Sequence, residues 1–113
     1  AAITGAWVAL RIACEKMLLS GAITRQPMRD HVAAISCGVW QGMPVADLDY
    51  AEDSTAEIDA NFVLSGDGGL VEIQATGEER PFRREELTRM PDLAEAGCQH
   101  LFTLQADAVR AAM

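Results

Sequence analysis

The sequence has few aromatic residues and few cysteines, and it has no long apolar run. Only 5% of its 113 residues are aromatic, so a core must be built mainly from Ala, Leu, Ile and Val. The three cysteines (Cys14, Cys37 and Cys98) are far apart and form no C-x-x-C pair, which predicts reduced thiols and no zinc site. Cys37 lies within an apolar run and is expected in the core. No run is long enough to span a membrane, and the first residues lack the basic head of a secretory signal. We therefore expect a cytoplasmic protein.

Positive charge is also scarce. Nine Lys and Arg residues stand against 17 Asp and Glu residues, which gives a net charge of −8. Affinity for the phosphates of nucleic acids comes mainly from Lys and Arg. Any role in RNA binding therefore requires positive charge from outside this chain.

The length and the apolar content predict one globular domain, residues 1–113. Half of the residues are apolar, and a chain of 113 residues can bury a real core. The chain lacks an initiator Met and starts inside a predicted helix. We expect it to be a piece of a longer protein.

Apolar periodicity predicts a helix at each end and strands between them. The first helix ends at Gly21, a C-terminal cap, and its apolar face holds Ile3, Trp7, Leu10, Cys14 and Met17. We expect Trp7 in the core. Two antiparallel hairpins follow, with strands at 32–40, 43–51, 59–65 and 70–75. In the last of these strands the alternating residues Val71, Ile73 and Ala75 predict one apolar face.

The last helical pattern starts at Phe82. Its apolar stripe consists of Leu87, Met90, Ala94, Gly97, Leu101, Leu104 and Ala108. Pro91 interrupts the stripe, and because an interior proline costs roughly 3 kcal/mol, we expect a kink or break near residue 90. The order of elements predicts an α+β fold, with helices packed on one face of a four-stranded antiparallel sheet.

Two local features have plain structural interpretations. The S-G-D-G-G segment (65–69) lacks the G-K-[ST] of a phosphate loop and has no helix after it, so it predicts a hairpin turn. His31 and His100 have no partner at ligand spacing, and we predict that neither is catalytic.

A basic cluster precedes the last helix. It consists of Arg80, Arg83 and Arg84. These side chains could contact RNA or a neighbouring subunit, but a solvated patch is the more common outcome.

The most unusual segment is the acidic stretch, residues 46–59. Six of its fourteen side chains are carboxylates: Asp47, Asp49, Glu52, Asp53, Glu57 and Asp59. Residues two apart in a strand share a face, so a continued strand would put Asp47 and Asp53 on one side. Ser54 to Glu57 fits the S-x-x-E capping box, which gives Glu57 a local structural role.

The pair formed by Asp47 and Asp53 has two chemical uses. Carboxylate oxygens suit a hard cation such as Mg²⁺, and a crowded carboxylate can instead act as a general acid. A solvated acidic rim accounts for the stretch equally well on the residues alone.

Several motifs together resemble a known family. They are D-L-D-Y-A-E-D-S-T-A-E-I-D-A-N (47–61), G-G-L-V-E-I-Q-A-T-G-E-E-R-P-F (68–82) and E-E-L (85–87), preceded by A-A-I-T-G-A-W-V-A-L at the start and V-A-A-I-S-C-G-V (32–39). In this order they resemble the carboxyl-terminal half of the ribonuclease PH family of phosphorolytic exoribonucleases. The resemblance covers nearly all of the chain without an insertion.

The resemblance implies a phosphate-dependent 3′-to-5′ exoribonuclease, also called a tRNA nucleotidyltransferase. Such enzymes remove 3′-terminal nucleotides of tRNA precursors as nucleoside diphosphates, with Mg²⁺ as cofactor and inorganic phosphate as co-substrate. They form a hexameric ring, a trimer of dimers, and share the fold of the second domain of ribosomal protein S5. Asp47 and Asp53 match the family's two active-site aspartates, with Asp53 as general acid or key metal ligand and Asp47 as its partner.

The resemblance also implies what this chain lacks. The family's phosphate-binding stretch, Gly-Gly-Thr-Arg-Thr, would directly precede Ala1. An amino-terminal half, on the same chain or on a companion chain, would supply the missing cations, so we expect the 113-residue chain alone to be inactive. The alternative is a non-catalytic ring subunit of an exosome-like RNA-processing assembly. The retained Asp47 and Asp53 argue against it.

Overall fold

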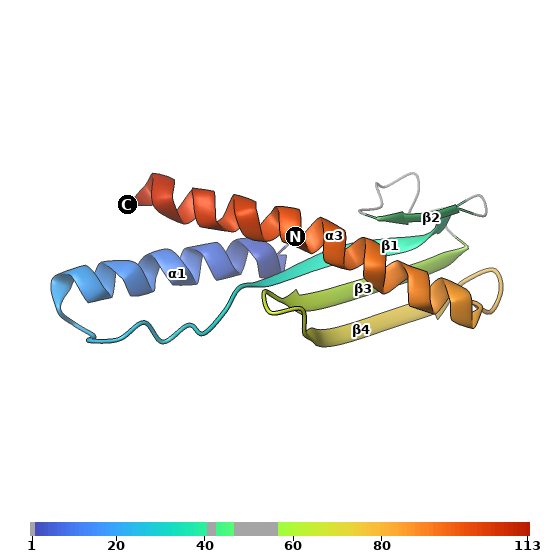
Figure 1. The fold of residues 1–113 in the computed structure, drawn as a ribbon, viewed down its shortest axis with the longest axis horizontal. Helices are drawn as coiled ribbons and strands as arrows, with labels where there is room; N and C mark the ends of the chain where they lie inside the picture. Colours follow the sequence, from blue (N-terminus) through green and yellow to red (C-terminus); the bar gives the residue numbers. More distant parts are fainter. Residues whose placement is uncertain (1, 41–42, 47–56) are drawn as a thin grey trace.

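The computed structural model describes residues 2–40, 43–46 and 57–113 (Figure 1). The elements follow in the order α1 (Ala2–Ser20), β1 (Val32–Trp40), β2 (Met43–Ala46), β3 (Ile58–Ser65), β4 (Leu70–Gly77) and α3 (Arg84–Ala112). The predicted order of helices and strands is therefore confirmed. Of the strand predicted at 43–51, the structure shows 43–46, and the remainder lies outside the described residues.

The strands form one antiparallel sheet in the order β2-β1-β3-β4. Three strands of eight or nine residues, β1, β3 and β4, make its body. The four-residue β2 pairs only with the second half of β1, from Cys37 opposite Ala46 to Trp40 opposite Met43. The first half of β1 therefore has β3 on one side and no strand on the other among the described residues.

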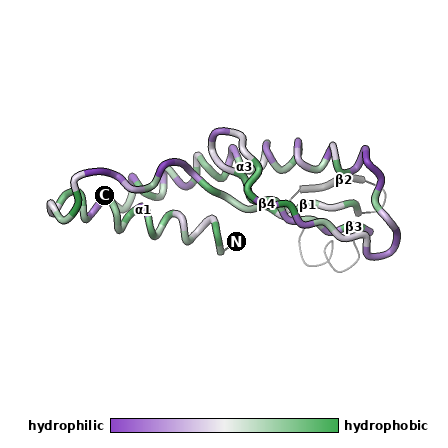
Figure 2. Tube along the Cα trace, turned by 90° about the horizontal axis from the view of Figure 1, so that it is seen from below, coloured by the Kyte–Doolittle hydropathy of each residue, from purple (hydrophilic) through white to green (hydrophobic). Residues whose placement is uncertain are grey.

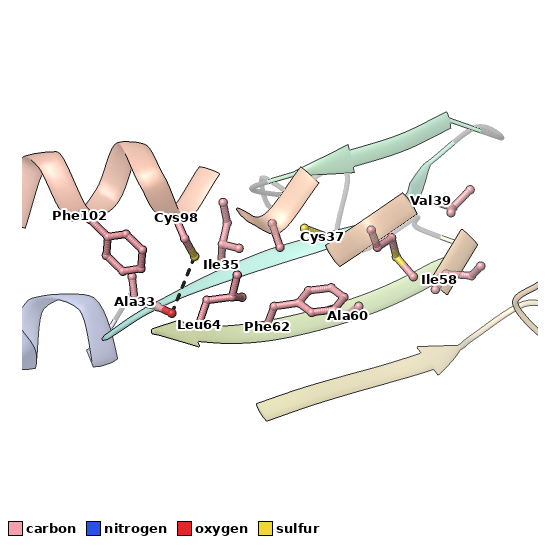
Figure 3. Close-up of a cluster of buried hydrophobic side chains, with 12 residues drawn as sticks. Ala33, Ile35, Cys37, Val39, Ile58, Ala60, Phe62, Leu64, Cys98 and Phe102 are labelled. Carbon is pink, nitrogen blue, oxygen red and sulfur yellow. Dashed lines mark hydrogen bonds between the residues drawn. The ribbon is translucent and has the colours of Figure 1, made fainter. Parts of the chain in front are cut away.

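The helix α3 lies across one face of the sheet and closes the core (Figures 1 and 3). Alternate residues of β1 and β3 point at it: Ala33, Ile35, Cys37, Val39, Ile58, Ala60, Phe62 and Leu64. From α3 come residues spaced four apart, Met90, Ala94, Cys98 and Phe102. Burial of this apolar surface is the main force that holds the helix on the sheet. The core position predicted for Cys37 is confirmed.

The course of α3 differs from the sequence prediction in two respects. The helix is not broken at Pro91 but runs through it from Arg84 to Ala112. Proline removes one helical N–H, and this cost is offset by burial of Met90 and Ala94 on either side of it. The predicted stripe also misplaces the core, because Leu87 and Leu104 are exposed whereas Cys98 and Phe102 are buried.

The helix α1 does not cover the sheet face as predicted. It lies beside the second half of α3 and meets the open edge of β1 (Figure 1). There the Thr4 hydroxyl accepts a hydrogen bond from the Ala34 N–H at 3.2 Å and contacts the Ala34 carbonyl at 3.5 Å. An open strand edge needs partners for its backbone groups, and Thr4 supplies one in place of a strand.

Only part of the predicted apolar face of α1 is buried. Trp7 and Cys14 are buried, as the core prediction for Trp7 requires, but Ile3, Leu10 and Met17 are exposed. Gly21 follows the helix with φ of 80°, which confirms its capping role. Among the described residues, neither helix has the length and apolar character needed to cross a membrane.

The hairpin of β3 and β4 is confirmed, but β4 is poorly covered. The turn has Gly68 at φ of 89°, and the Gly69 N–H donates to the Ser65 hydroxyl at 3.1 Å. Leu70, Val71 and Ile73 stay exposed because α3 packs on β1, β2 and β3 and leaves β4 largely uncovered. The apolar face predicted for β4 therefore exists but remains at the surface, and apolar segments are visible along the chain in Figure 2.

Candidate active site around the acidic stretch

The two predicted site residues, Asp47 and Asp53, lie outside the described residues. The structure does describe the two ends of the segment that carries them. Ala46 ends β2 opposite Cys37, and Ile58 starts β3 opposite Val39. These two ends therefore lie on opposite sides of β1, and the start of β3 is at the end of the sheet near the start of α3 (Figure 1).

Glu57 is the described residue of the acidic stretch at which the chain enters β3. Its N–H donates to the Val39 carbonyl at 2.9 Å. Its own carbonyl accepts from the N–H groups of Glu78 at 3.0 Å and Glu79 at 3.4 Å. The backbone of Glu57 is thus fixed both to β1 and to the turn that follows β4.

The side chain of Glu57 is held by Arg80. Arg80 Nε donates to Glu57 Oε2 at 2.9 Å. The two terminal nitrogens of Arg80 donate to both carboxylate oxygens of Glu86, at 2.9 and 2.7 Å. Ser54, the capping-box partner predicted for Glu57, lies outside the described residues, so that prediction stays open. The ion pair with Arg80 is a role that local spacing could not show.

These contacts shift the pKa values of Glu86 and Arg80. The hydrogen bonds from Arg80 hold the pKa of Glu86 at about 2, well below its usual value. The same bonds to Glu86 and Glu57 raise the pKa of the Arg80 guanidinium. Glu86 also accepts the Arg83 N–H at 2.8 Å, so it both caps the start of α3 and binds the turn.

The basic cluster therefore divides into two kinds of residue. Arg80 is engaged by two carboxylates, whereas the side chains of Arg83 and Arg84 are exposed. Arg80, Phe82, Arg83 and Glu86 line a shallow depression of about 670 Å³ beside the end of the acidic stretch. Among the described residues, this depression therefore has one arginine bound by carboxylates, Arg80, and one exposed arginine, Arg83.

His31 belongs to a different part of the molecule and has a structural role. Its ring stacks on Trp7 with centroids 4.1 Å apart. Its Nδ1 lies 3.1 Å from Oε1 of the buried Gln105, whose amide nitrogen donates to the carbonyls of Thr4 and Val32. Because both amide hydrogens are used on carbonyls, Oε1 must accept, and Nδ1 of His31 carries the proton. Sequence reasoning missed Gln105, since a glutamine on an apolar helix face gives no signal of three distant partners.

A second hollow lies beside this network. It has a volume of about 390 Å³ between α1 and the end of α3 and is lined by Trp7, Arg11, Glu15, His31, Ala106, Val109, Arg110 and Met113. Arg11 pairs with Glu15 and Arg110 pairs with Asp107, so its charges are already compensated. The hollow lies at the other end of the molecule from the start of β3, where the acidic stretch ends (Figure 1). It therefore belongs to a separate region of the surface.

Within the described part of the chain, no three His, Cys, Asp or Glu side chains form a cluster that could hold a metal ion. Aspartate oxygens are the ligands that Mg²⁺ takes, so the donor chemistry of Asp47 and Asp53 fits that ion.

Comparison with solved structures defines the class of fold. The rice (Oryza sativa) protein Rrp46 superposes with a TM-score of 0.65 at 19% sequence identity, covering 86% of this chain and 44% of that one. The exosome of Archaeoglobus fulgidus with RNA bound to its active site superposes with a TM-score of 0.57 at 16% identity, over 67% of this chain and 30% of that one. At these identities the likeness shows a shared fold.

Sequence comparison defines the family. Residues 30–97 match the model of the 3′ exoribonuclease family, domain 2, and the chain belongs to this family. It is 56% identical over 109 residues to ribonuclease PH of Methylobacterium radiotolerans, and 57% identical to ribonuclease PH of Caulobacter vibrioides. Each match covers 96% of this chain and 46% of the relative, so the chain spans about half the length of the curated relatives it matches. The family expected from the sequence motifs is confirmed.

Proposed function

We propose that this chain is the acidic half of a phosphate-dependent 3′-to-5′ exoribonuclease that trims the 3′ ends of tRNA precursors. The observation that carries the proposal is the identity of 56% to ribonuclease PH of Methylobacterium radiotolerans over 96% of the chain. Membership of the 3′ exoribonuclease family supports the same reaction class. The acidic motif with Asp47 and Asp53 lies inside the matched residues.

In the proposed reaction, an oxygen of inorganic phosphate attacks the phosphorus of the last phosphodiester of the RNA. A new P–O bond forms, the bond to the 3′ oxygen of the preceding nucleotide breaks, and a nucleoside diphosphate leaves. Asp53 either gives a proton to that departing 3′ oxygen as general acid or is the key ligand of the metal, and Asp47 is its partner. With Asp53 as a ligand, Mg²⁺ would be held by the carboxylates of Asp47 and Asp53 and would stabilise the negative charge on the phosphoryl oxygens.

This half requires an amino-terminal half to complete the enzyme. The net charge of −8 cannot attract phosphate or RNA, so the cations come from the amino-terminal half that the relatives carry. We propose that the completed protein has the fold of the second domain of ribosomal protein S5, assembles as a hexameric ring of three dimers, and works in the cytoplasm.

The decisive assay uses the joined protein, which is this chain fused behind the amino-terminal half of the Methylobacterium radiotolerans relative. With inorganic phosphate and Mg²⁺ it should shorten a tRNA that has extra 3′ nucleotides and release nucleoside diphosphates, detected by chromatography. Asp53→Asn keeps the shape of the side chain but cannot supply a proton or a full ligand charge. We expect it to lower kcat by about 10²- to 10⁴-fold.

Asp92→Asn is the matched control, because Asp92 is an exposed aspartate on α3, outside the acidic stretch in the sequence. We expect its activity to equal that of the unaltered joined protein. Equal activity in Asp53→Asn and Asp92→Asn would contradict the role of Asp53 and favour the non-catalytic ring subunit of an exosome-like assembly. Phosphorolysis by the 113-residue chain alone would contradict the division of charge between the halves.

A further inference from the structure

A single guanidinium links the end of the acidic stretch to the start of α3. Arg80 lies in the turn between β4 and α3, 23 residues after Glu57. Besides its bonds to Glu57 and Glu86, its Nη1 donates to the Pro81 carbonyl at 3.1 Å. A guanidinium has five N–H donors, and these contacts use four of them. The side chain is therefore held in one orientation although it is partly exposed.

The backbone of the turn holds Arg80 in contact with Glu57. The N–H groups of Glu78 and Glu79 both donate to the Glu57 carbonyl. Gly77 has no space for a side chain, since a Cβ there would lie 2.1 Å from the Arg80 carbonyl oxygen. The turn thus folds back closely beside the start of β3, and both the main chain and the side chain of Glu57 are bound to it.

The charge of Arg80 is as important as its position. Among the described residues, Arg80 is the cation that pairs with both Glu57 and Glu86. Without it the carboxylates would repel each other and the rest of the stretch. Ion pairs this exposed contribute little to global stability, so the main effect of Arg80 is on local geometry.

We propose that Arg80 is a positioning residue for the acidic site: it fixes Glu57 against α3 and thereby anchors the chain four residues after Asp53. The proposal rests on the proposed function, because it takes Asp53 as a residue of the site. Some groups hydrogen-bond to a metal ligand or catalytic side chain and so orient it. Removing such a group changes metal affinity or activity by about 10- to 100-fold. Catalytic side chains must also be held within about 0.5 Å of their productive positions.

The test compares three variants of the joined protein. Arg80→Met removes the charge and all donors, and Arg80→Lys keeps the charge but loses the planar fork. Arg89→Met is the matched control, because Arg89 is exposed on α3 and no ion pair of it occurs among the described residues. For each, phosphorolysis is measured over a range of Mg²⁺ concentrations, and amide hydrogen exchange is measured by NMR at Glu57, Glu78 and Glu79.

We expect Arg80→Met to raise the Mg²⁺ concentration for half-maximal activity by about 10-fold or more, with the KM for RNA unchanged. Arg80→Lys should lie between Arg80→Met and the unaltered protein. The amides of Glu57 and Glu78 should exchange fastest in Arg80→Met and at an intermediate rate in Arg80→Lys. Arg89→Met should match the unaltered protein in every measurement.

Two outcomes would overturn the proposal. In the first, Arg80→Met and Arg89→Met have the same Mg²⁺ dependence. In the second, Arg80→Met loses the same fraction of activity at every Mg²⁺ concentration, which is the result of a merely structural role. If the unaltered joined protein has no phosphorolytic activity, the proposed function fails instead. The amide exchange then still decides whether Arg80 anchors Glu57, since unchanged exchange in Arg80→Met would refute the anchor.

Discussion

At the scale of the residue, Glu86 combines two roles that are usually separate. It caps α3 by accepting the Arg83 N–H, and it receives both terminal nitrogens of Arg80. Its side chain is 15% exposed, so these bonds are partly shielded from water. All of these donors favour the ionised carboxylate, which is why its pKa falls to about 2.

A pH dependence follows from this shift. Because the folded pKa lies below the usual value of 4.5, ionised Glu86 stabilises the fold above about pH 4.5, and this contribution is lost as the pH falls toward 2. In the joined protein, Glu86→Gln should lower stability at pH 7 by about 1 kcal/mol. The difference in Tm from the unaltered protein should shrink steadily below about pH 4.5, as followed by circular dichroism.

Glu85→Gln is the control for this prediction, since Glu85 is exposed and precedes Glu86 in the same helical turn. Its difference in Tm should be small at all pH values. A difference for Glu86→Gln that stays constant from pH 7 to pH 3 would show that the lost bonds do not depend on the charge of the carboxylate.

At the scale of the element, α3 approaches the sheet through a glycine. A Cβ at Gly97 would lie 2.2 Å from Cδ1 of Ile35, a side chain that packs in the core. A side chain at residue 97 therefore requires the Cδ1 methyl group of Ile35 to move within the core. The sequence pattern placed Gly97 on the apolar face of the helix, but only the packed structure shows which atom it faces.

Gly97→Ala should consequently destabilise the protein although alanine favours helices. The helical gain of about 1 kcal/mol is smaller than the overpacking cost of about 1 to 3 kcal/mol, so we expect a net loss of about 1 kcal/mol. Ile35→Val removes the methyl group in question, and in that background Gly97→Ala should cost much less. Urea denaturation of the joined protein with both single variants and the double variant measures this coupling.

Gly5→Ala is the matched control, because a Cβ at Gly5 in α1 has nothing within 4 Å. It should stabilise the protein by about 0.5 to 1 kcal/mol. If Gly97→Ala were equally stabilising, the close approach of α3 to Ile35 would be wrong.

At the scale of the whole molecule, one buried amide ties together segments that are far apart in the chain. Gln105 is 2% exposed and bonds to Thr4 in α1, Val32 at the start of β1 and the ring of His31. Trp7 completes the joint by stacking on His31 and donating to the Asp30 carbonyl at 2.9 Å. This polar joint, rather than apolar packing alone, sets α1 beside α3.

Gln105→Leu tests this joint. The apolar side chain would leave the buried carbonyl of Val32 and the His31 N–H without their partner, at about 1 to 3 kcal/mol for each group. We expect the joined protein to lose about 2 kcal/mol or more of unfolding free energy in urea. Gln99→Leu, an exposed position on the same helix, should change stability by less than about 0.5 kcal/mol. Equal effects of the two changes would rule out the joint.

The molecule is also more elongated than a compact domain with the same number of residues. Its radius of gyration is 16.5 Å, against about 13 Å for a compact domain of about this length. The reason is visible in Figure 1, where α1 and the second half of α3 extend beyond the sheet. The exposed Leu10, Met17 and Leu19 of α1 follow from this shape, since no sheet lies under them.

Much of the fold was determined by the sequence itself, because local patterns repeat with the period of the backbone. The apolar segments at 32–40 and 59–65 predicted the two central strands, the S-G-D-G-G segment predicted the hairpin turn, and Gly21 predicted the end of α1. The family was likewise determined by motifs that stand in the chain. The assignment of Asp47 and Asp53 to the active site comes from those motifs and remains a prediction.

Only the tertiary structure decided which contacts join distant segments. The bond from Arg80 to Glu57, the fit of Gly97 on Ile35, and the joint at Gln105 link residues that no local period relates. The same holds for Pro91, which α3 accepts because the packed face on both sides outweighs one missing hydrogen bond. A periodic pattern records which side of an element is apolar, whereas the partner on that side depends on how all the elements assemble.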